Sequence, residues 1–179
     1  MSKQAFNAND LWQISRVGIP KLSPNGRYIA YTSTTFEVEE NLGQSHIFLY
    51  EIESNLTRQL TFGKGKNDSP SWSEDSNFII FTSNRDSKTN QIFKIAISGG
   101  EAEKISDLPV SVIQPRFIPG KNKIAFLASI PAEAHSMDEV ASKLEDRKKN
   151  KVKAHITEDR VYRFWDHWLT HGDYYHVFE

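Results

Sequence analysis

The sequence predicts an all-β fold built from repeated four-stranded sheets, and two observations indicate it. One strand–turn–strand pattern occurs three times, in residues 20–31, 70–81 and 115–126, so that its copies start 50 and then 45 residues apart. Two further strand candidates recur at the 45-residue spacing: 47–52 matches 92–97, and 58–61 matches 103–106. A period in this range is typical of a β-propeller blade, a small sheet that buries its faces only against neighbouring blades.

Each repeat holds four strand candidates, which is the number of strands in a propeller blade. We expect residues 1–18 to form an N-terminal segment with a short helix, and residues 19–179 to form a partial propeller. The expected blade limits are 19–62, 69–107 and 114–179, with a helical insertion over 132–158 in the third blade. Three blades do not close a ring, so the chain is expected to be part of a larger propeller.

The turn residues support this register. Residues 23–26 (Ser-Pro-Asn-Gly) fit a type I turn, and residues 118–121 (Ile-Pro-Gly-Lys) fit a type II turn in which glycine takes the positive φ. Residues 98–101 (Ser-Gly-Gly-Glu) predict a hairpin tip between the last two strands of blade two. Residues 78–81 are apolar on both faces, as a strand between two neighbouring blades requires.

Two segments outside the repeat predict helices. Asp10 and Gln13 have the spacing of a capping box, so a short helix is expected over residues 11–17, ending at Gly18. Residues 136–150 predict a mostly solvated surface helix that starts at a second capping box, Ser136 with Glu139. Its expected apolar stripe is Met137, Val140, Ala141 and Leu144, and its expected ion pairs are Glu139/Lys143 and Glu145/Lys149.

Two aromatic-rich segments follow, residues 160–168 and 174–179, and each predicts a strand. The second corresponds to residues 47–52 and is expected to be the third strand of blade three, with its outer edge unpaired. The aromatic side chains could stack on nucleic acid bases, but packing between blades or against a missing domain is the preferred interpretation. They are Tyr162, Phe164, Trp165, Trp168, Tyr174, Tyr175 and Phe178.

Composition excludes several classes of protein. The net charge of −1 argues against a broad electrostatic contact with nucleic acid or an anionic membrane. No segment approaches the roughly 20 apolar residues of a membrane helix, and the first residues lack the apolar core of a signal peptide. The chain has no cysteine, which excludes disulfides, thiolate metal sites and cysteine nucleophiles. We therefore expect a cytoplasmic protein without a cofactor.

The sequence predicts no catalytic residue and no metal site. Ser45 lies in Gly-Gln-Ser-His-Ile, which lacks the second glycine of a nucleophile elbow. His167 and His171, near Asp166 and Asp173, would converge on a metal from a helix, but here they fit polar residues of a strand and a turn.

Glu39 and Glu40 are the only candidates for substrate binding. They lie on the loop between two strands of blade one. If they faced a central cavity, the two carboxylates would hold the free amino group of a peptide. A solvated loop is the alternative.

With these motifs the chain resembles the β-propeller of the prolyl oligopeptidase family, in its acylaminoacyl-peptidase-like branch. The resemblance covers most of the chain, and TolB-type propellers share the blade motif. The segments that carry it are 10–18, 22–31, 58–61, 83–86 and 162–166. It implies a seven-bladed propeller over an α/β-hydrolase domain with a Ser-Asp-His triad. That domain would follow the propeller, so no triad residue can be assigned here.

The resemblance implies a gate that admits short or flexible peptides to a cytoplasmic serine peptidase and excludes folded proteins. The peptide substrate would be cleaved by the missing hydrolase domain, and this chain alone would be inactive. The alternative is a protein-binding module that closes its ring when two copies pair through their open blade edges. A periplasmic TolB-type propeller is a third possibility, which the missing signal sequence disfavours.

Overall fold

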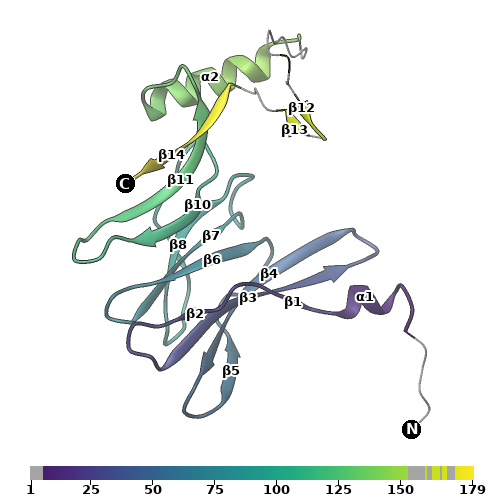
Figure 1. Cartoon of the computed structure of the whole chain (residues 1–179), viewed down its shortest axis with the longest axis vertical. Coiled ribbons are helices and arrows are strands. Elements are labelled where there is room, and N and C mark those ends of the chain that lie inside the picture. The colour runs from purple at the N-terminus through teal and green to yellow at the C-terminus, as the bar shows by residue number, and fades with distance from the viewer. Residues whose placement is uncertain (1–5, 153–159, 161–162, 166, 169–171) are drawn as a thin grey trace.

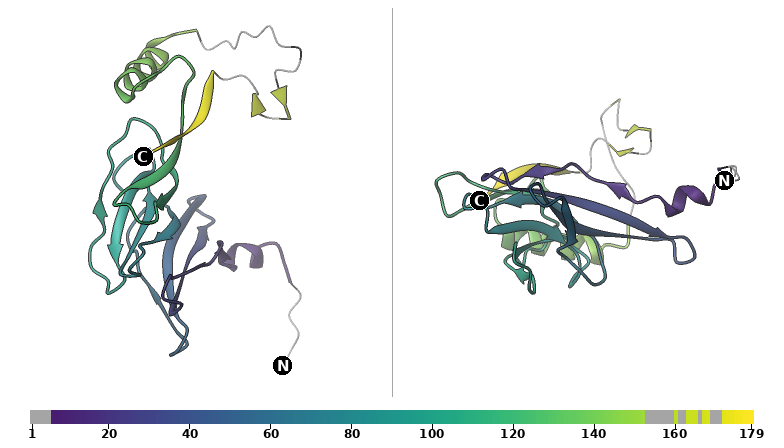
Figure 2. Two further views of the ribbon diagram at one scale, coloured as in Figure 1. Left: turned by 60° about the vertical axis from the view of Figure 1, so that its left-hand side comes forward. Right: turned by 90° about the horizontal axis from the view of Figure 1, so that it is seen from below.

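The computed structural model of the chain describes residues 6–152, 160, 163–165, 167–168 and 172–179. Three antiparallel sheets, one for each blade, follow one another in chain order and each packs against the next, while a fourth, two-stranded sheet lies apart from them (Figure 1 and Figure 2). Their inner strands are β2 (Lys21–Leu22), β6 (Asn67–Trp72) and β10 (Ile113–Phe117), and β6 is in contact with both of the others. The predicted all-β fold, a partial propeller of three blades, is confirmed.

The first two blades each have the expected four strands. Blade 1 contains β2 (Lys21–Leu22), β3 (Tyr28–Glu37), β4 (Leu42–Glu51) and β5 (Leu56–Gln59), and a short strand β1 (Arg16–Val17) also pairs with β3. Blade 2 contains β6 (Asn67–Trp72), β7 (Phe78–Ser83), β8 (Gln91–Ala96) and β9 (Glu103–Lys104). The two blades also share an individual hydrogen bond. Ile47 N donates to Thr61 Oγ1 in blade 1, and Ile92 N, 45 residues later, donates to Ser106 Oγ in blade 2.

Blade 3 has three described strands. They are β10 (Ile113–Phe117), β11 (Ile124–Pro131) and β14 (Asp173–Phe178). β14 pairs with β11 over six residues, from Phe126 with Phe178 to Pro131 with Asp173. The C-terminal segment is thus the third strand of the blade, as predicted, and most of its side chains are exposed.

The turns between the first two strands of each blade share one design. The amide of the fourth residue donates to the carbonyl of the first at 2.9 Å in 23–26, 3.0 Å in 73–76 and 3.1 Å in 118–121. Gly26 and Gly120 have φ of 71° and 68°, which explains why glycine occupies these positions. The hairpin tip between β8 and β9 is also confirmed, since Gly99 and Gly100 both have positive φ.

These turns also join consecutive blades. Asn25 N donates to Ser76 Oγ of the next blade at 3.1 Å, and Gly120 N donates to Glu74 Oε1 at 2.5 Å. Trp72 lies between the first two blades and donates its indole N–H to the Lys21 carbonyl at 2.8 Å. The turn after the first strand of each described blade is therefore hydrogen-bonded to the corresponding turn of the blade beside it.

The core lies between the blades and is centred on blade 2. Ile79, Ile80, Phe81 and Phe93 are all at most 2% exposed. The cluster between blades 1 and 2 adds Ile47 and other side chains of β4, and Ile80 instead packs toward blade 3. β7 is thus buried on both faces, as its uninterrupted apolar sequence predicts.

The N-terminal helix is shorter than predicted. α1 (Asp10–Gln13) has one turn, because the chain is extended at Ile14 and then forms β1. The expected capping box at Asp10 and Gln13 is wrong: Asn7 Oδ1 accepts from Asp10 N at 3.3 Å, and Asp10 Oδ2 accepts from Asn7 N at 2.8 Å. The N-cap residue is Asn9, which makes no side-chain cap hydrogen bond, so the Asn7–Asp10 bonds close the turn that precedes the helix.

The inserted helix α2 (Met137–Lys149) lies where predicted, and of its residues only Val140 is buried. The expected ion pairs Glu139/Lys143 and Glu145/Lys149 are wrong. Glu139 Oε2 instead accepts from His135 N at 2.7 Å, and Glu145 pairs with Lys148 at 2.7 Å. Of all described helices, none has the length and apolar character to cross a membrane.

The α2 cap provides a test of local stability. Ser136 Oγ accepts from Glu139 N at 3.2 Å. Ser136→Ala should lower the free energy of unfolding by about 1 kcal/mol, because the amide loses its partner. Ser142→Ala, on the exposed surface of the same helix, is the matched control and should have no such effect. Equal urea midpoints for the two variants would contradict the assignment of the cap.

The segment before β14 departs from the predicted single strand over 160–168. β12 (Arg163–Phe164) and β13 (His167–Trp168) pair with each other as a small hairpin. Trp165 between them has φ of 55°, a turn conformation that a continuous strand does not contain. Aromatic residues favour strands but do not specify where a strand reverses, which explains the difference.

Candidate functional site

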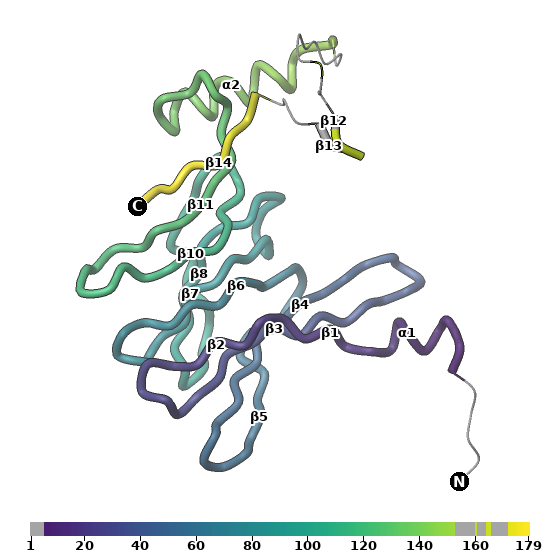
Figure 3. Tube along the Cα trace, viewed as in Figure 1, coloured from purple at the N-terminus to yellow at the C-terminus, as the bar shows by residue number. Residues whose placement is uncertain are grey.

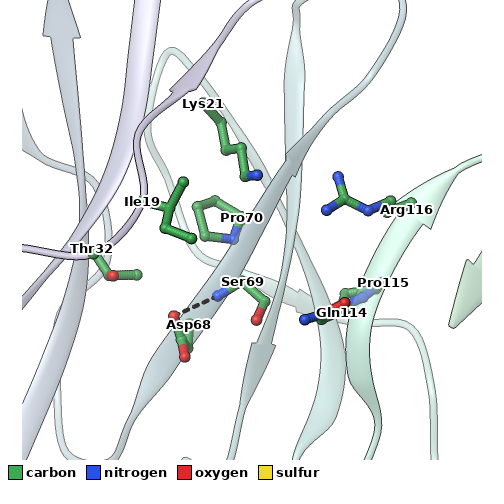
Figure 4. A pocket seen from close by; sticks show the side chains of 10 residues that line it. Ile19, Lys21, Thr32, Asp68, Ser69, Pro70, Gln114, Pro115 and Arg116 are labelled. Carbon is green, nitrogen blue, oxygen red and sulfur yellow. Dashed lines mark hydrogen bonds between the residues drawn. The ribbon is translucent and has the colours of Figure 1, made fainter. Parts of the chain in front are cut away.

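The inner strands of the three blades line an open hollow of about 370 Å³ (Figure 4). β2, β6 and β10 border it, and the segment before β2 completes one wall. A β-carbon at Gly18 would lie 2.1 Å from Thr32 Oγ1, so glycine allows this segment to lie directly against β3. Since the innermost strands of a propeller surround its central channel, the hollow belongs to the channel wall.

Two bulges shape this wall. The register shifts between Asp68 and Ser71 in β6 and between Ile113 and Arg116 in β10. Ser69 and Gln114 have φ of 54° and 49°, although each precedes a proline, which normally keeps the preceding residue extended. Ser69 N donates to Asp68 Oδ1 at 2.7 Å, which supports the bulged conformation. Ser69 and Gln114 therefore line the hollow at equivalent places in consecutive blades (Figure 4).

A second hollow, of about 480 Å³, continues the first and is also lined by residues of all three blades, among them Thr34, Thr82 and Ile113. The two share Gly18, Thr32, Asp68 and Ser69. We call them together the inner groove. Arg16 and Phe36 line only the second hollow, where the Arg16 guanidinium lies 4.5 Å from the centre of the Phe36 ring.

The charged residues that line the inner groove are mainly cationic. Lys21 and Arg116 line the first hollow, and Arg16 and Lys66 line the second. Asp68 is the one carboxylate among the described residues of the lining. An arrangement with this charge attracts anions and repels cations.

A buried polar cluster holds β6 in place beside blade 1. Its centre is Asn67, which is fully buried. Asn67 Nδ2 donates to the Ser45 carbonyl at 2.8 Å, and Asn67 Oδ1 accepts from Ser83 Oγ at 3.0 Å and from Arg85 Nη2 at 2.6 Å. Asn67 Nδ2 also lies 3.5 Å from His46 Nδ1. We call these five residues the Asn67 cluster.

Arg85 connects the Asn67 cluster to the core. Its guanidinium carbon lies 5.0 Å from the centre of the Phe93 ring and 5.5 Å from that of Phe81. Burial lowers the pKa of Arg85, while Asp86 and Glu101 act in the opposite direction. Burial is also the main cause that lowers the pKa of His46, and the charge of Arg85 adds to it. The folded protein therefore favours a neutral imidazole at position 46.

This pKa shift predicts that acid destabilises the fold. The unfolded chain binds a proton at His46 near pH 6.5, whereas the folded chain does so only at lower pH. The free energy of unfolding should therefore decrease as pH falls below 6.5 and should be independent of this group at higher pH. Urea midpoints between pH 5 and 7.5 would measure the slope. His46→Gln should flatten it, and His135→Gln, at an exposed position, should leave it unchanged.

The predicted site residues within the described part of the chain do not line the inner groove, with one exception. Glu39 and Glu40 are exposed at the tip of the long β3–β4 hairpin, which projects from blade 1 beside α1 (Figure 3). They are not among the residues that line the inner groove, and their role in substrate binding stays a prediction. Ser45 is the exception: it lines the second hollow but belongs to the Asn67 cluster, where its hydroxyl accepts from Asn67 N.

The candidate metal ligands lie partly outside the described residues. His171 and Asp166 are outside the described residues, and His167 lies in β13. No group of three or more potential metal ligands occurs within residues 6–152 or the described C-terminal residues. Asp173 pairs with Arg147 of α2 at 2.6 Å.

The aromatic residues of the C-terminal segments are mostly exposed. Phe178 stacks on Phe126 within blade 3, with ring centres 5.5 Å apart. Trp165 and Tyr175 are 85% and 68% exposed, and Phe164 and Tyr174 are also exposed. Tyr162 lies outside the described residues. Packing within blade 3 thus accounts for Phe178, whereas the other four rings are exposed.

Sequence reasoning missed the bulges and the cationic inner groove. Pro70 and Pro115 were the available signal, because proline inside a strand is confined to edges and bulges. The position after each repeat's first proline holds Lys21, Ser71 and Arg116. The Asn67 cluster had no signal of this kind, because its members are far apart in the sequence and the equivalent of Asn67 in the next blade is Val112.

Two relatives named as peptidases resemble the chain. One is YuxL, an uncharacterized peptidase of Bacillus subtilis, which is 29% identical over 137 residues, or 76% of this chain and 21% of its own length. The other is dipeptidyl-peptidase 5 of Porphyromonas endodontalis, 22% identical over 161 residues, or 89% of this chain and 22% of its own length. The chain thus spans about a fifth of the length of each of these two relatives.

Solved structures share the fold. A TolB protein from Agrobacterium tumefaciens has a TM-score of 0.51 and 27% identity, covering 64% of this chain and 39% of its own. The acylaminoacyl peptidase of Pyrococcus horikoshii has a TM-score of 0.57 and 14% identity, covering 70% of this chain and 19% of its own. The sequence profile of the TolB beta propeller domain matches residues 15–152, which include the first two blades and the paired β10 and β11. The chain belongs to the TolB beta propeller domain family.

Proposed function

We propose that the chain is part of the propeller of a serine peptidase and controls which peptides reach the active site. The observation that carries the proposal is the inner groove, because three consecutive blades place their first strands along one open channel wall. The relatives named as peptidases support it. The channel would admit short or flexible peptides, whereas a folded protein would be too wide to enter.

The catalytic groups belong to a separate α/β-hydrolase domain in this proposal. The chain itself should hydrolyse neither peptides nor esters. The first test is to read the gene beyond the codon for Glu179. A reading frame that continues through further blade repeats into a Gly-x-Ser-x-Gly segment would support the proposal. An immediate stop codon, or turnover by this chain that a serine-directed inhibitor abolishes, would refute it.

Size selection needs its own measurement in the longer protein. The same short sequence would be offered as a free peptide and within a tightly folded protein. Cleavage of the free peptide alone is the expected result. Equal cleavage of both substrates would contradict a gate, even if the peptidase assignment held. The cytoplasmic location stays a prediction.

The second candidate function is a binding module formed by two copies of the chain. The favouring observation is the outer edge of β14, which is unpaired among the described residues and presents Tyr174, Tyr175 and Val177. An unpaired strand edge is a template for pairing with another chain. Light scattering of the purified chain would decide, since a strictly monomeric mass would refute this alternative.

A further inference from the structure

The cationic side chains of the inner groove are not neutralised by ion pairs within the described residues. Lys21, Arg116, Arg16 and Lys66 form no ion pair with any residue in the described part of the chain. Together with Asp68 they give the groove a net charge of +3 (four cations against one carboxylate), although the whole chain has a net charge of −1. Positive charge is therefore concentrated on the surface that faces the channel.

Two of the cations occupy equivalent positions in blades 1 and 3. Lys21 follows Pro20, and Arg116 follows Pro115 after the bulge in β10. Both line the first hollow, where they flank β6 from opposite sides, with Pro70 and Ser69 between them (Figure 4). β6 offers Ser71 at the same repeat position, so the space between the two cations is not filled by a third long side chain.

The chemistry of the two groups defines a ligand. A guanidinium presents a planar set of donors that matches the two oxygens of a carboxylate, and an ammonium is a compact charge with three donors. The Ser69 hydroxyl and the Gln114 amide, which the bulges place on the same wall, are additional hydrogen-bonding groups. Cationic ligands are disfavoured there, because the four cationic side chains outnumber the one carboxylate, Asp68.

We propose that the inner groove binds acidic peptide segments, with Lys21 and Arg116 as the principal contacts for a carboxylate. The carboxylate would come from a glutamate or aspartate side chain or from the C-terminus of the peptide. The inference rests on the proposed gate for its biological meaning, since it makes the channel selective for charge as well as size. Binding itself requires no hydrolase domain.

The test begins with the unaltered 179-residue chain and three labelled peptides of equal length. One is rich in glutamate and has an amidated C-terminus, the second replaces every glutamate by glutamine, and the third is the glutamine peptide with a free C-terminal carboxylate. Fluorescence anisotropy at low ionic strength should show at least about tenfold tighter binding of the glutamate peptide than of the amidated glutamine peptide. Its affinity should decrease as salt is added.

The third peptide distinguishes the two sources of carboxylate. If it binds as tightly as the glutamate peptide, the groove recognises a C-terminus; if it binds like the amidated glutamine peptide, it recognises acidic side chains. Equal affinity for all three peptides would overturn the inference. So would tighter binding of a single-stranded oligonucleotide, which would indicate a general polyanion surface.

Variants then locate the site. The double variant K21Q/R116Q should weaken binding of the glutamate peptide about tenfold, because it removes two solvent-accessible ion pairs. The control K148Q/K149Q removes the same charge from α2 and should change affinity less than about twofold. D68N should strengthen binding. Equal losses from the two double variants would assign the effect to overall charge and refute the groove.

The result of these binding experiments can be distinguished from the result of the gene-sequence test of the proposed function. If the chain binds acidic peptides but its gene encodes no hydrolase domain, the inference about the groove would stand and the peptidase assignment would be refuted. Melting temperatures of all variants would establish that they are folded. The comparison of the three peptides with the unaltered chain does not depend on any variant.

Discussion

Replacing Phe81 by alanine should lower the free energy of unfolding by about 3–5 kcal/mol, the largest effect expected of a single substitution here. Phe81 lies in β7, is fully buried and stacks on Phe93 with ring centres 5.9 Å apart. The Arg85 guanidinium covers the same ring pair. Alanine would leave a cavity between blades 1 and 2 that a sheet buried on both faces cannot collapse to fill.

Urea denaturation followed by tryptophan fluorescence would measure the effect. Phe62→Ala is the matched control, because Phe62 is 66% exposed and its loss should change stability by less than about 0.5 kcal/mol. A loss below about 1 kcal/mol for Phe81→Ala would mean that blades 1 and 2 are not packed as described.

The second large effect is expected at Asn67. Asn67→Ala should destabilise the fold by about 2–4 kcal/mol, because it removes the partner of the Ser45 carbonyl, the Ser83 hydroxyl and the Arg85 guanidinium. The cost comes from polar groups that stay buried without a hydrogen bond, and a partly buried cation is the most expensive of them.

A valine at position 67 separates this effect from simple loss of volume. Valine is the residue at the equivalent place in the next blade, Val112, and it fills most of the space of asparagine. Asn67→Val should nevertheless be about as destabilising as Asn67→Ala, since neither can hydrogen-bond. Asn122→Ala, at an exposed position, is the control. A neutral Asn67→Val variant would show that the cluster contributes little.

The elements that the sequence predicted correctly are those with a local signal. The blade repeat, the turns at Gly26 and Gly120 and the buried strand β7 all depend on residues adjacent in the chain. The errors arose where two local signals compete. Asp10 can cap a helix or bond back to Asn7 in the turn before it, and the aromatic run around Trp165 favours strands without specifying where the chain reverses.

The candidate site was harder to predict than the fold. The inner groove combines side chains from three blades, and their proximity depends on how the blades pack. The bulges at Ser69 and Gln114 decide which side chains face the channel, and a bulge reverses the alternation on which strand predictions rest. Pro70 and Pro115 follow these residues in the sequence, but only the backbone geometry that the two blades share identifies them as parts of bulges.

The hydrogen bonds between successive turns influence the order in which the blades unfold. They connect Asn25 with Ser76 and Glu74 with Gly120, so among the described residues these bonds join each blade to its immediate neighbour. Such a nearest-neighbour array loses its ends first and its centre last. Amide hydrogens of β7 and β8 should therefore exchange with deuterium most slowly, whereas those of β5 and β14 should exchange within the first local openings. Among the described blades, the middle one is covered on both sides, so in this 179-residue chain it should be the last to lose its structure.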